Sequence, residues 1–305
     1  MISMSKKLMN KTPIRYAGGK TRAIKHIIPY FPTDLTNVIS PFMGGGSLEV
    51  YLTNLNINVH GFDIFKPLVT FWDEMINDNE NFVNFLRTIE PTAENYKVVK
   101  DKLVNWEYTQ EMLKGWKTDF YIRKNPITLT PVEIASYYYF NHNTSYGPGY
   151  LGWPSSVYLT QAKWNKMIDD ISKFNGSKLR VSQSDFSDVI TGHPNDFIYL
   201  DPPYFMGKDS DNKMHAAIYP MKNIPVHHEG FNHELLRDLL HSHPGKFIMS
   251  YNNCETIREY YKDFRLEYPT WNYSMGNGET RIGENRTREG IVNHKESHEI
   301  LIIKE

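Results

Sequence analysis

The sequence predicts an α/β fold, with an open and largely parallel sheet whose chain is interrupted by a helical insertion. Short apolar segments alternate with amphipathic helical segments towards both ends of the chain. Two of the apolar segments run directly into a glycine-rich or a proline-rich turn, which is where open α/β sheets place their ligands. Between these two parts, residues 78–175 carry helical patterns and loops but no strand pattern.

The composition is typical of a soluble globular protein. Of 305 residues, 40% are hydrophobic and 23% are charged, which leaves ample chain for a sizeable core. The single cysteine excludes an internal disulfide and is typical of a reducing compartment. Neither residues 1–11 nor any later stretch resembles a signal peptide or a membrane span, so we expect a cytoplasmic, intracellular protein with no membrane partner. Because the net charge is −1, any contact with nucleic acid must rely on local positive charge.

The first motif is T-P-I-R-Y-A-G-G-K at residues 12–20, followed by a predicted helix at Thr21–Tyr30 that Pro32 ends. Two glycines and Lys20 ahead of a helix can bind an anion through backbone N–H groups and one positive charge. A tight loop is the commoner explanation of such a sequence.

A glycine-rich turn, F-M-G-G-G-S at residues 42–47, lies between a predicted strand at Asn37–Pro41 and a predicted helix. The next predicted strand, Asn58–Ile64, contains Asp63, 18 residues beyond Gly45. An acidic residue about 20 residues after such a turn is where a ribose hydroxyl pair is usually held. This combination predicts a nucleotide-like cofactor site. A plain βαβ turn with a helix-capping aspartate is the alternative.

The middle of the chain is predicted to be helical, at Pro67–Asn77, Asn79–Ile89, Thr92–Asn105, Pro131–Phe140 and Gln161–Phe174. Residues 141–156 read N-H-N-T-S-Y-G-P-G-Y-L-G-W-P-S-S, which combines amide, hydroxyl and aromatic side chains with turn residues. Such a loop on a helical support is suited to base contacts, and an ordinary long loop is an equal alternative.

The α/β alternation resumes with predicted strands at Leu179–Ser182, Phe197–Leu200, Lys246–Tyr251, Arg265–Tyr273 and Glu299–Lys304, and predicted helices at Phe231–His243 and Cys254–Lys262. Residues 207–230 have no clear periodicity and predict a loop beside the site. Glycines at 276 and 278 mark a further loop at 274–289. The five histidines between residues 227 and 243 match no standard metal spacing, so no metal site is expected.

The strand at 197–200 ends in the tetrad Asp201, Pro202, Pro203 and Tyr204. Two prolines cannot donate to a β-ladder, so the strand ends there and the tetrad lies at the carboxyl edge of the sheet. The Asp201 carboxylate and the Pro202 carbonyl could accept both N–H bonds of a nucleobase amine and aim its lone pair at an electrophile. Tyr204 offers a ring on which a planar base can stack. For the tetrad alone, a turn with a surface aspartate is an equal alternative.

Together these blocks resemble the Dam-type (D12 class) adenine-N6-specific DNA methyltransferases. R-Y-A-G-G-K at 15–20 resembles the opening motif of that family, and P-F-M-G-G-G-S at 41–47 with G-F-D-I at 61–64 resembles its cofactor motifs. D-F at 185–186 and D-P-P-Y at 201–204 resemble the later motifs. The five blocks occur in the family's order from about residue 15 onwards, and the resemblance is thin between residues 77 and 178.

The resemblance implies a Rossmann-like S-adenosylmethionine-dependent methyltransferase sheet, with a catalytic domain at 12–77 and 176–305 and a target-recognition insertion at 78–175. It implies site-specific methyl transfer from S-adenosyl-L-methionine to adenine N6 in duplex DNA by base flipping. The implied partners are double-stranded DNA and a cognate restriction endonuclease that acts separately. Because residues 141–150 depart from the family's usual asparagine-, phenylalanine- and glycine-rich stretch, no recognition sequence is predicted.

The resemblance and the loop at 141–156 assign site residues to three groups. For catalysis they are Asp201, Pro202, Pro203 and Tyr204. For cofactor binding they are Tyr16, Lys20, Phe42, Gly44, Gly45, Gly46, Asp63, Asp185, Phe186 and Asp201. For DNA binding they are Arg15, Asn141, Asn143, Tyr146 and Trp153. Tyr16 stands where the family commonly has a tryptophan, and either ring can stack.

Two alternatives remain open. A cytosine-N4 DNA methyltransferase would use the same chemistry, but that class more often begins its tetrad with serine and its block order differs. A non-catalytic DNA-binding or cofactor-sensing relative would keep the fold without turnover, and the intact Asp63, Asp201 and Tyr204 argue against it.

Overall fold

The computed structural model describes residues 11–16, 18–109, 127–147, 149–205, 230–269 and 299–305. Their strands are β1 (Asn37–Ser40), β2 (Asn58–Asp63), β3 (Leu179–Gln183), β4 (Ile198–Leu200), β5 (Phe247–Asn252), β6 (Arg265–Glu267) and β7 (Glu299–Lys304). They form one seven-stranded sheet in the order β3-β2-β1-β4-β5-β7-β6. The first five strands are parallel, and β7 is antiparallel to both of its neighbours. The predicted α/β, Rossmann-like sheet is confirmed.

The helices before the insertion are η1 (Lys20–Arg22), α1 (Ile24–Ile27), η2 (Ile28–Tyr30), α2 (Ser47–Asn54) and α3 (Lys66–Asn77). Those within residues 78–175 are α4 (Asn79–Arg87), α5 (Ala93–Thr109), α6 (Pro131–Asn143) and α7 (Gln161–Ser172). The remaining ones are α8 (Phe186–Gly192), α10 (His233–Ser242) and α11 (Glu255–Tyr260). The single helix predicted at Thr21–Tyr30 is instead a 3-10, α, 3-10 succession, in which Pro29 lies near the start of η2 and lacks an N–H donor.

Both faces of the sheet are buried, as a parallel sheet requires. On β7, Leu301 and Ile303 belong to one apolar cluster, while Ile300 and Ile302 belong to a second cluster on the opposite face. The first cluster includes residues of α1, α2 and α3, and the second includes residues of α8, α10 and α11. The central strands β4 and β5 are buried at every position. The charged and polar site residues therefore lie at the strand ends rather than along the faces.

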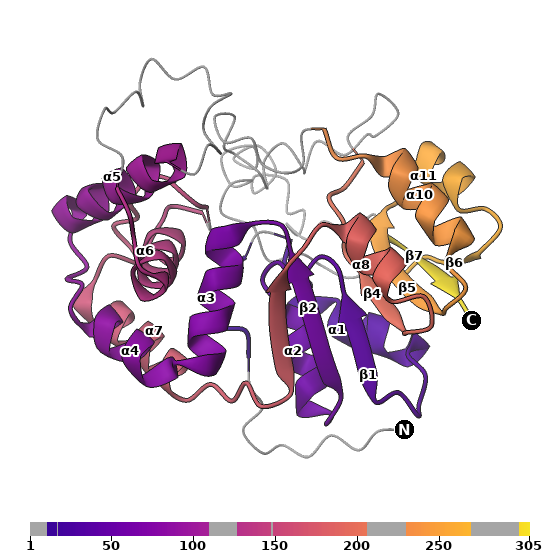
Figure 1. The fold of residues 1–305 in the computed structure, drawn as a ribbon, viewed down its shortest axis with the longest axis horizontal. Helices are drawn as coiled ribbons and strands as arrows, with labels where there is room; N and C mark the ends of the chain where they lie inside the picture. Colours follow the sequence, from indigo (N-terminus) through magenta and orange to yellow (C-terminus); the bar gives the residue numbers. More distant parts are fainter. Residues whose placement is uncertain (1–10, 17, 110–126, 148, 206–229, 270–298) are drawn as a thin grey trace, which may run out of the picture.

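The helices α4–α7 gather on one side of the sheet, and α3 stands between them and β3 (Figure 1). The central helix of this group is α6, which is buried continuously from Ile134 to Asn143. It begins with a capping box, in which Thr130 accepts from the Glu133 N–H and the Glu133 carboxylate accepts from the Thr130 N–H. A helix that is buried all round needs neighbours on every side, and α3, α4 and α5 provide them.

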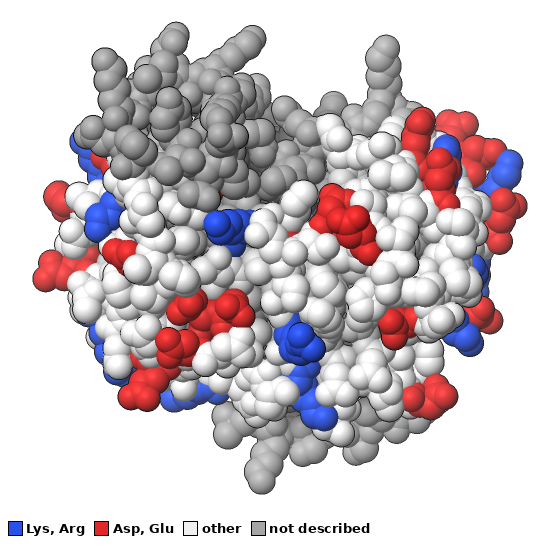
Figure 2. Space-filling model, in the orientation of Figure 1, with Lys and Arg blue, Asp and Glu red and all other residues white. Residues whose placement is uncertain are grey.

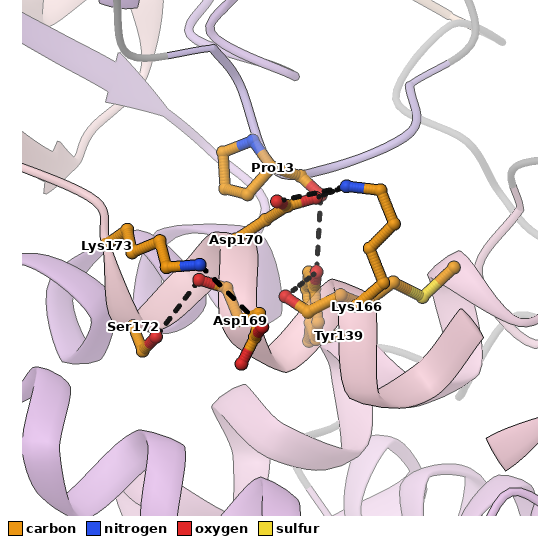
Figure 3. A network of polar contacts seen from close by, with 8 residues as sticks. Pro13, Tyr139, Lys166, Asp169, Asp170, Ser172 and Lys173 are labelled. Atoms are coloured by element: carbon orange, nitrogen blue, oxygen red, sulfur yellow. Dashed lines mark hydrogen bonds and ion pairs between the residues drawn. The ribbon is translucent and has the colours of Figure 1, made fainter. Parts of the chain in front are cut away.

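Tyr139 on α6 joins this group to the start of the chain (Figure 3). The Tyr139 hydroxyl on α6 donates to the carbonyl of Pro13 at 3.3 Å and lies 3.5 Å from the carbonyl of Met167 on α7. On the outer side of α7, Lys166 pairs with Asp170 at 3.0 Å. Such exposed pairs contribute about 0–1 kcal/mol each, so the buried contacts of Tyr139 are the more important attachment.

Two features of the predicted elements need correction. Helix α8 was not predicted, because seven residues are too few to show a periodic pattern; Asp185 caps it by accepting from the Ser187 N–H at 2.9 Å. Helix α6 runs three residues further than predicted and includes Asn141–Asn143, the start of the predicted loop. The loops predicted at 207–230 and 274–289 lie outside the described residues, except for Gly230. The predicted strand at Arg265–Tyr273 is described only to residue 269 and ends at Glu267.

In the described part of the chain, no helix has the length and hydrophobicity needed to cross a membrane. Among the same residues, no three His, Cys, Asp or Glu side chains are grouped so that they could hold a metal ion. His227 and His228 lie outside the described residues.

Candidate active site

The predicted catalytic and cofactor residues converge on one edge of the sheet. The glycine-rich loop follows β1, Asp63 ends β2, and the tetrad follows β4. In the sheet, β1 and β4 are neighbours. The next strand after β1, β2, lies on one side of this pair, and the next strand after β4, β5, lies on the other. This is the topological switch point at which open α/β sheets bind ligands. Because β7 is antiparallel to β5, its first residue, Glu299, also reaches this edge, opposite Asn252.

The glycine-rich loop is held close against its surroundings. Gly44 and Gly46 adopt φ values of +46° and +61°, which disfavour other residues. A Cβ on Gly45 would lie 2.3 Å from the Cβ of Tyr16, so the Tyr16 side chain lies directly over the loop. The Trp72 indole N–H on α3 donates to the Gly44 carbonyl at 3.1 Å. The loop is therefore closely packed, with Gly45 and Gly46 buried and Gly44 partly exposed.

Asp63 connects this loop to β2. Its Oδ2 accepts from the Gly44 N–H at 3.0 Å, and its Oδ1 accepts from the Phe65 N–H at 2.9 Å. The carboxylate thus lies at the end of the glycine loop. The other two predicted cofactor residues, Asp185 and Phe186, follow β3, and the Phe186 ring stacks on Phe42 with centroids 5.6 Å apart.

The lysine of the opening motif contacts the tetrad. Lys20 is 4% exposed, and its Nζ lies 2.8 Å from Asp201 Oδ1 and donates to the Tyr204 hydroxyl at 2.9 Å. Burial lowers the pKa of Lys20, but the carboxylates of Asp201 and Glu299 outweigh burial and raise it, so the lysine is charged. Burial raises the pKa of Asp201, and Lys20 opposes that shift. The structure therefore brings together residues that lie 181 positions apart in the sequence.

The tetrad itself is fixed by a neighbouring strand. The Asn252 side chain at the end of β5 accepts from the Phe205 N–H at 2.8 Å and donates to the Phe205 carbonyl at 3.0 Å. The Tyr204 ring is 9% exposed and stacks on Tyr251 with centroids 6.1 Å apart. The Asp201 side chain remains 24% exposed, so its carboxylate lies at the surface of the site rather than in the core.

The residues predicted to bind DNA divide into two sets. Asn141 and Asn143 are completely buried. Asn141 Oδ1 accepts from the Leu151 N–H at 2.6 Å, and Asn143 Oδ1 accepts from the Arg15 N–H at 2.8 Å. The Arg15 guanidinium donates to the Asn143 carbonyl at 2.7 Å and lies 3.5 Å from the Tyr158 ring centroid. Arg15 and Asn143 thus join the opening motif to the end of α6, while Asn141 joins α6 to the loop that follows it.

Tyr146 and Trp153, in contrast, are 69% and 75% exposed. They belong to a hairpin-like loop in which the Tyr146 N–H donates to the Trp153 carbonyl at 2.6 Å and Ser145 bridges to Pro154. Lys100 lies beside this loop, with its Nζ 5.5 Å from the Trp153 ring centroid and 3.2 Å from the Gly152 carbonyl. Figure 2 shows acidic and basic side chains scattered over the face in view.

Sequence reasoning missed three polar residues of the site: Asn252, Glu299 and Glu49. Each is nearly completely buried beside the tetrad or the glycine loop. Ser40 donates to Glu49 at 2.8 Å, and burial raises the pKa of Glu49 to about 7. A polar residue at a strand end gives no sequence signal of burial, although Asn252 and Glu299 both stand next to apolar strand patterns.

Comparison with known proteins agrees with this geometry. The chain is 23% identical over 275 residues to the modification methylase StsI of Streptococcus sanguinis, an alignment that covers 79% of this chain and 39% of that protein. It is 26% identical over 208 residues to the type II methyltransferase M.FokI of Planomicrobium okeanokoites, with 66% and 30% covered. It is 24% identical over 204 residues to the type II methyltransferase M.CviBI of Paramecium bursaria Chlorella virus NC1A, with 64% and 69% covered.

The chain therefore spans well under half of the length of the first two relatives. A family model described as D12 class N6 adenine-specific DNA methyltransferase matches residues 16–275, which include the glycine loop, Asp63 and the tetrad. The match thus extends over most of the chain, from the opening motif to beyond β6. The chain belongs to the D12 class of N6 adenine-specific DNA methyltransferases.

Proposed function

We propose that this protein transfers a methyl group from S-adenosyl-L-methionine to adenine N6 at a specific site in duplex DNA. The observation that carries the proposal is the Asp201 carboxylate, held by Lys20 at 2.8 Å beside the glycine loop at the switch point of the sheet. Membership of the D12 class supports both the acceptor and the cofactor. An enzyme acting on a base in a duplex must first flip that base out of the stack.

The residues present fit S-adenosyl-L-methionine. The absence of side chains at Gly44 and Gly45 lets the Tyr16 ring lie against the loop, and Asp63 at the end of that loop offers a carboxylate to ribose hydroxyls. Tyr16 over the loop, and the stacked Phe42 and Phe186, supply aromatic surfaces for the adenosine and methionine parts. The cofactor supplies a methyl group on a positively charged sulfur that leaves as a neutral thioether.

In the proposed mechanism, Asp201 and the Pro202 carbonyl accept the two N–H bonds of the adenine amine. These hydrogen bonds orient the lone pair of N6 towards the methyl group and stabilise the positive charge that develops on nitrogen. Pro202 and Pro203 restrict the backbone that carries this carbonyl, and Asn252 fixes the following residue. Tyr204 is assigned to stack on the flipped base, and N6 loses its proton after methyl transfer.

Recognition of DNA is assigned to the segment 78–175, and the catalytic domain to residues 12–77 and 176–305. All seven strands of the described residues lie in the part assigned to the catalytic domain. Tyr146 and Trp153 are proposed to contact bases directly because both rings are exposed. Arg15, Asn141 and Asn143 are proposed to support this loop from beneath, with Arg15 connecting it to the opening motif of which it is a part.

The partners proposed are double-stranded DNA and a cognate restriction endonuclease that acts separately. The relatives are named modification methylase and type II methyltransferase, which supports this pairing.

Methylation-sensitive sequencing tests the proposed activity. Unmethylated bacterial genomic DNA is incubated with the protein and S-adenosyl-L-methionine and then sequenced by a method that distinguishes N6-methyladenine from N4-methylcytosine. We expect N6-methyladenine within one short sequence and unmodified adenine elsewhere. Modification of cytosine would support the cytosine-N4 alternative, and no modification at any base would support a non-catalytic relative.

A further inference from the structure

We propose that Glu299 is a positioning residue that shares the Lys20 ammonium with Asp201 and so keeps Asp201 a strong hydrogen-bond acceptor for the adenine amine. This inference rests on the proposed function, because it concerns the strength with which Asp201 binds and orients N6. It assigns a role to a buried carboxylate that is 98 residues away from the tetrad in the sequence.

Glu299 reaches the site through the direction of its strand. It is the first residue of β7, which pairs antiparallel with β5 and places Glu299 opposite Asn252. The side chain is almost completely buried. Ser250 donates to its Oε2 at 2.8 Å, and the Tyr204 hydroxyl also hydrogen-bonds to this carboxylate. A buried carboxylate needs such partners, and a nearby ammonium stabilises it further.

That ammonium is Lys20, whose Nζ lies 3.8 Å from Glu299 Oε1. Its closer contacts are Asp201 Oδ1 at 2.8 Å, the Tyr204 hydroxyl at 2.9 Å and the Gly18 carbonyl at 3.3 Å. Lys20 thus donates to Asp201 and attracts Glu299 without a hydrogen bond. One positive charge lies between two carboxylates and can fully compensate only one of them.

The consequence concerns the basicity of Asp201. A carboxylate paired with an ammonium of its own loses proton affinity and accepts weaker hydrogen bonds. The negative charge of Glu299 opposes this effect by drawing on the same ammonium and by repelling a second negative charge. The pKa of Glu299 is raised by burial, with Lys20 lowering it and Asp201 raising it further.

Other groups that face this cluster come from three elements. Glu49 on α2 has a pKa raised to about 7 by burial, so it is uncharged over most of the acidic range. Tyr199 on β4 has a pKa raised well above its ordinary value by burial and by Asp201, so it stays neutral. Tyr204 and Ser250 are hydroxyl donors in the cluster. Asp201, Glu299 and Lys20 are the remaining titratable members of the cluster.

The test is the pH dependence of single-turnover methyl transfer into the duplex identified by sequencing, with saturating cofactor. Transfer fails at acidic pH when Asp201 is protonated, so the acidic limb of the profile reports its pKa. In Glu299→Gln the amide oxygen can still accept from Ser250, but the negative charge is gone. We expect the acidic limb to move to lower pH and the plateau rate to fall about three- to tenfold, because the acceptor is less basic. The affinity for the duplex should not change.

Glu107→Gln is a matched control. Glu107 is also buried, accepts from one hydroxyl, that of Tyr150, at 2.8 Å, and has a second oxygen without a hydrogen-bond partner among the described residues. Its pKa is raised to about 7 by burial, and the charge acting on it is that of Lys66 rather than Lys20. This variant should keep the acidic limb of the wild-type profile. Glu299→Asp retains the charge and should restore the limb towards the wild-type position.

The outcomes separate the inference from the proposed function. If wild-type protein transfers methyl groups but Glu299→Gln leaves the limb unmoved, or moves it to higher pH, Glu299 has no influence on Asp201 and the inference is wrong. Equal losses in Glu299→Asp and Glu299→Gln without a shift would indicate a purely structural role. If Glu299→Gln does not fold, Ser250→Ala decides, because loss of its hydrogen bond eases protonation of Glu299 and should move the limb in the same direction. No transfer by wild-type protein at any pH would overturn the proposed function, and this inference with it.

Discussion

At the scale of single residues, Asp63 combines structural contacts with a proposed role in cofactor binding. Its carboxylate holds the glycine loop through the N–H groups of Gly44 and Phe65, and it is proposed to bind the cofactor ribose. Asp63→Ala should weaken cofactor binding by about 1–3 kcal/mol, the contribution of a charge-assisted hydrogen bond. Calorimetric titration with S-adenosyl-L-methionine measures this loss. Asp63→Asn, which keeps one oxygen for a loop N–H, is the control, and unaltered affinity in both variants would remove Asp63 from the cofactor site.

Glu107 makes a prediction about stability. Burial raises its pKa in the folded protein to about 7, whereas an unfolded glutamate titrates near its ordinary value of 4.5. The folded state therefore binds more protons than the unfolded state between these two values, so the free energy of unfolding falls as pH rises through this window. The loss reaches about 3 kcal/mol above the folded pKa.

Glu107→Gln should remove this contribution, because the amide does not titrate and its oxygen can still accept from Tyr150. Urea denaturation at pH 5 and pH 8 checks the prediction. The variant should lose less stability than the wild-type protein between the two pH values. An identical pH dependence in both proteins would mean that Glu107 is not buried in its uncharged form.

Asp201 illustrates why the choice of substitution matters. It pairs with a buried lysine, and removal of one partner of a buried pair typically costs about 3–5 kcal/mol. The remaining exposure of Asp201 and the neighbouring Glu299 reduce that cost, but alanine still tests folding together with chemistry. Asparagine keeps an oxygen for Lys20 and removes only the charge. Asp201→Asn is therefore the sharper variant of the tetrad.

At the scale of elements, the loop that follows α6 is supported by buried residues at the end of the helix and carries exposed aromatic side chains. Asn143 supports it from within by accepting from the Arg15 N–H, and Tyr146 and Trp153 project from it. The structure therefore separates buried supporting residues from exposed aromatic ones within 13 residues of sequence.

Asn143→Ala should lower the free energy of unfolding by about 1–3 kcal/mol, because the Arg15 N–H loses its partner. Tyr146→Ala and Trp153→Ala should leave stability nearly unchanged and weaken binding to the target duplex by about 1–3 kcal/mol each. Urea denaturation and fluorescence anisotropy with labelled duplex measure the two quantities. If both aromatic variants bind and methylate the same sites as the wild-type protein, recognition lies elsewhere in the chain.

The same loop shows where sequence-based prediction ends. Amide side chains next to glycine and proline indicated an exposed loop, yet Asn141 and Asn143 are buried. Their partners are Leu151, 10 residues away, and Arg15, 128 residues away. A burial that depends on such a distant partner leaves no local pattern. The strands, in contrast, were predicted to within about two residues at most of their ends, because apolar runs bounded by turn residues are local signals.

At the scale of the whole molecule, the order of the strands assembles the site. The spacing of glycines and Asp63 and the prolines after β4 were enough to predict which residues lie at the carboxyl edge. They could not show that Lys20 contacts Asp201, nor that an antiparallel strand brings Glu299 to the same edge. Those contacts depend on pairings between distant strands, which only the folded sheet defines.

The central claim is that Asp201 directs methyl transfer to the adenine amine. The most direct measurement is mass spectrometry of nucleosides from duplex DNA incubated with protein and methyl-labelled S-adenosyl-L-methionine, for wild-type protein and for Asp201→Asn. We predict labelled N6-methyladenine from the wild-type protein and a loss on the order of a hundredfold or more in Asp201→Asn, with folding retained by circular dichroism. Label in N4-methylcytosine, or equal amounts of N6-methyladenine from both proteins, would contradict the claim.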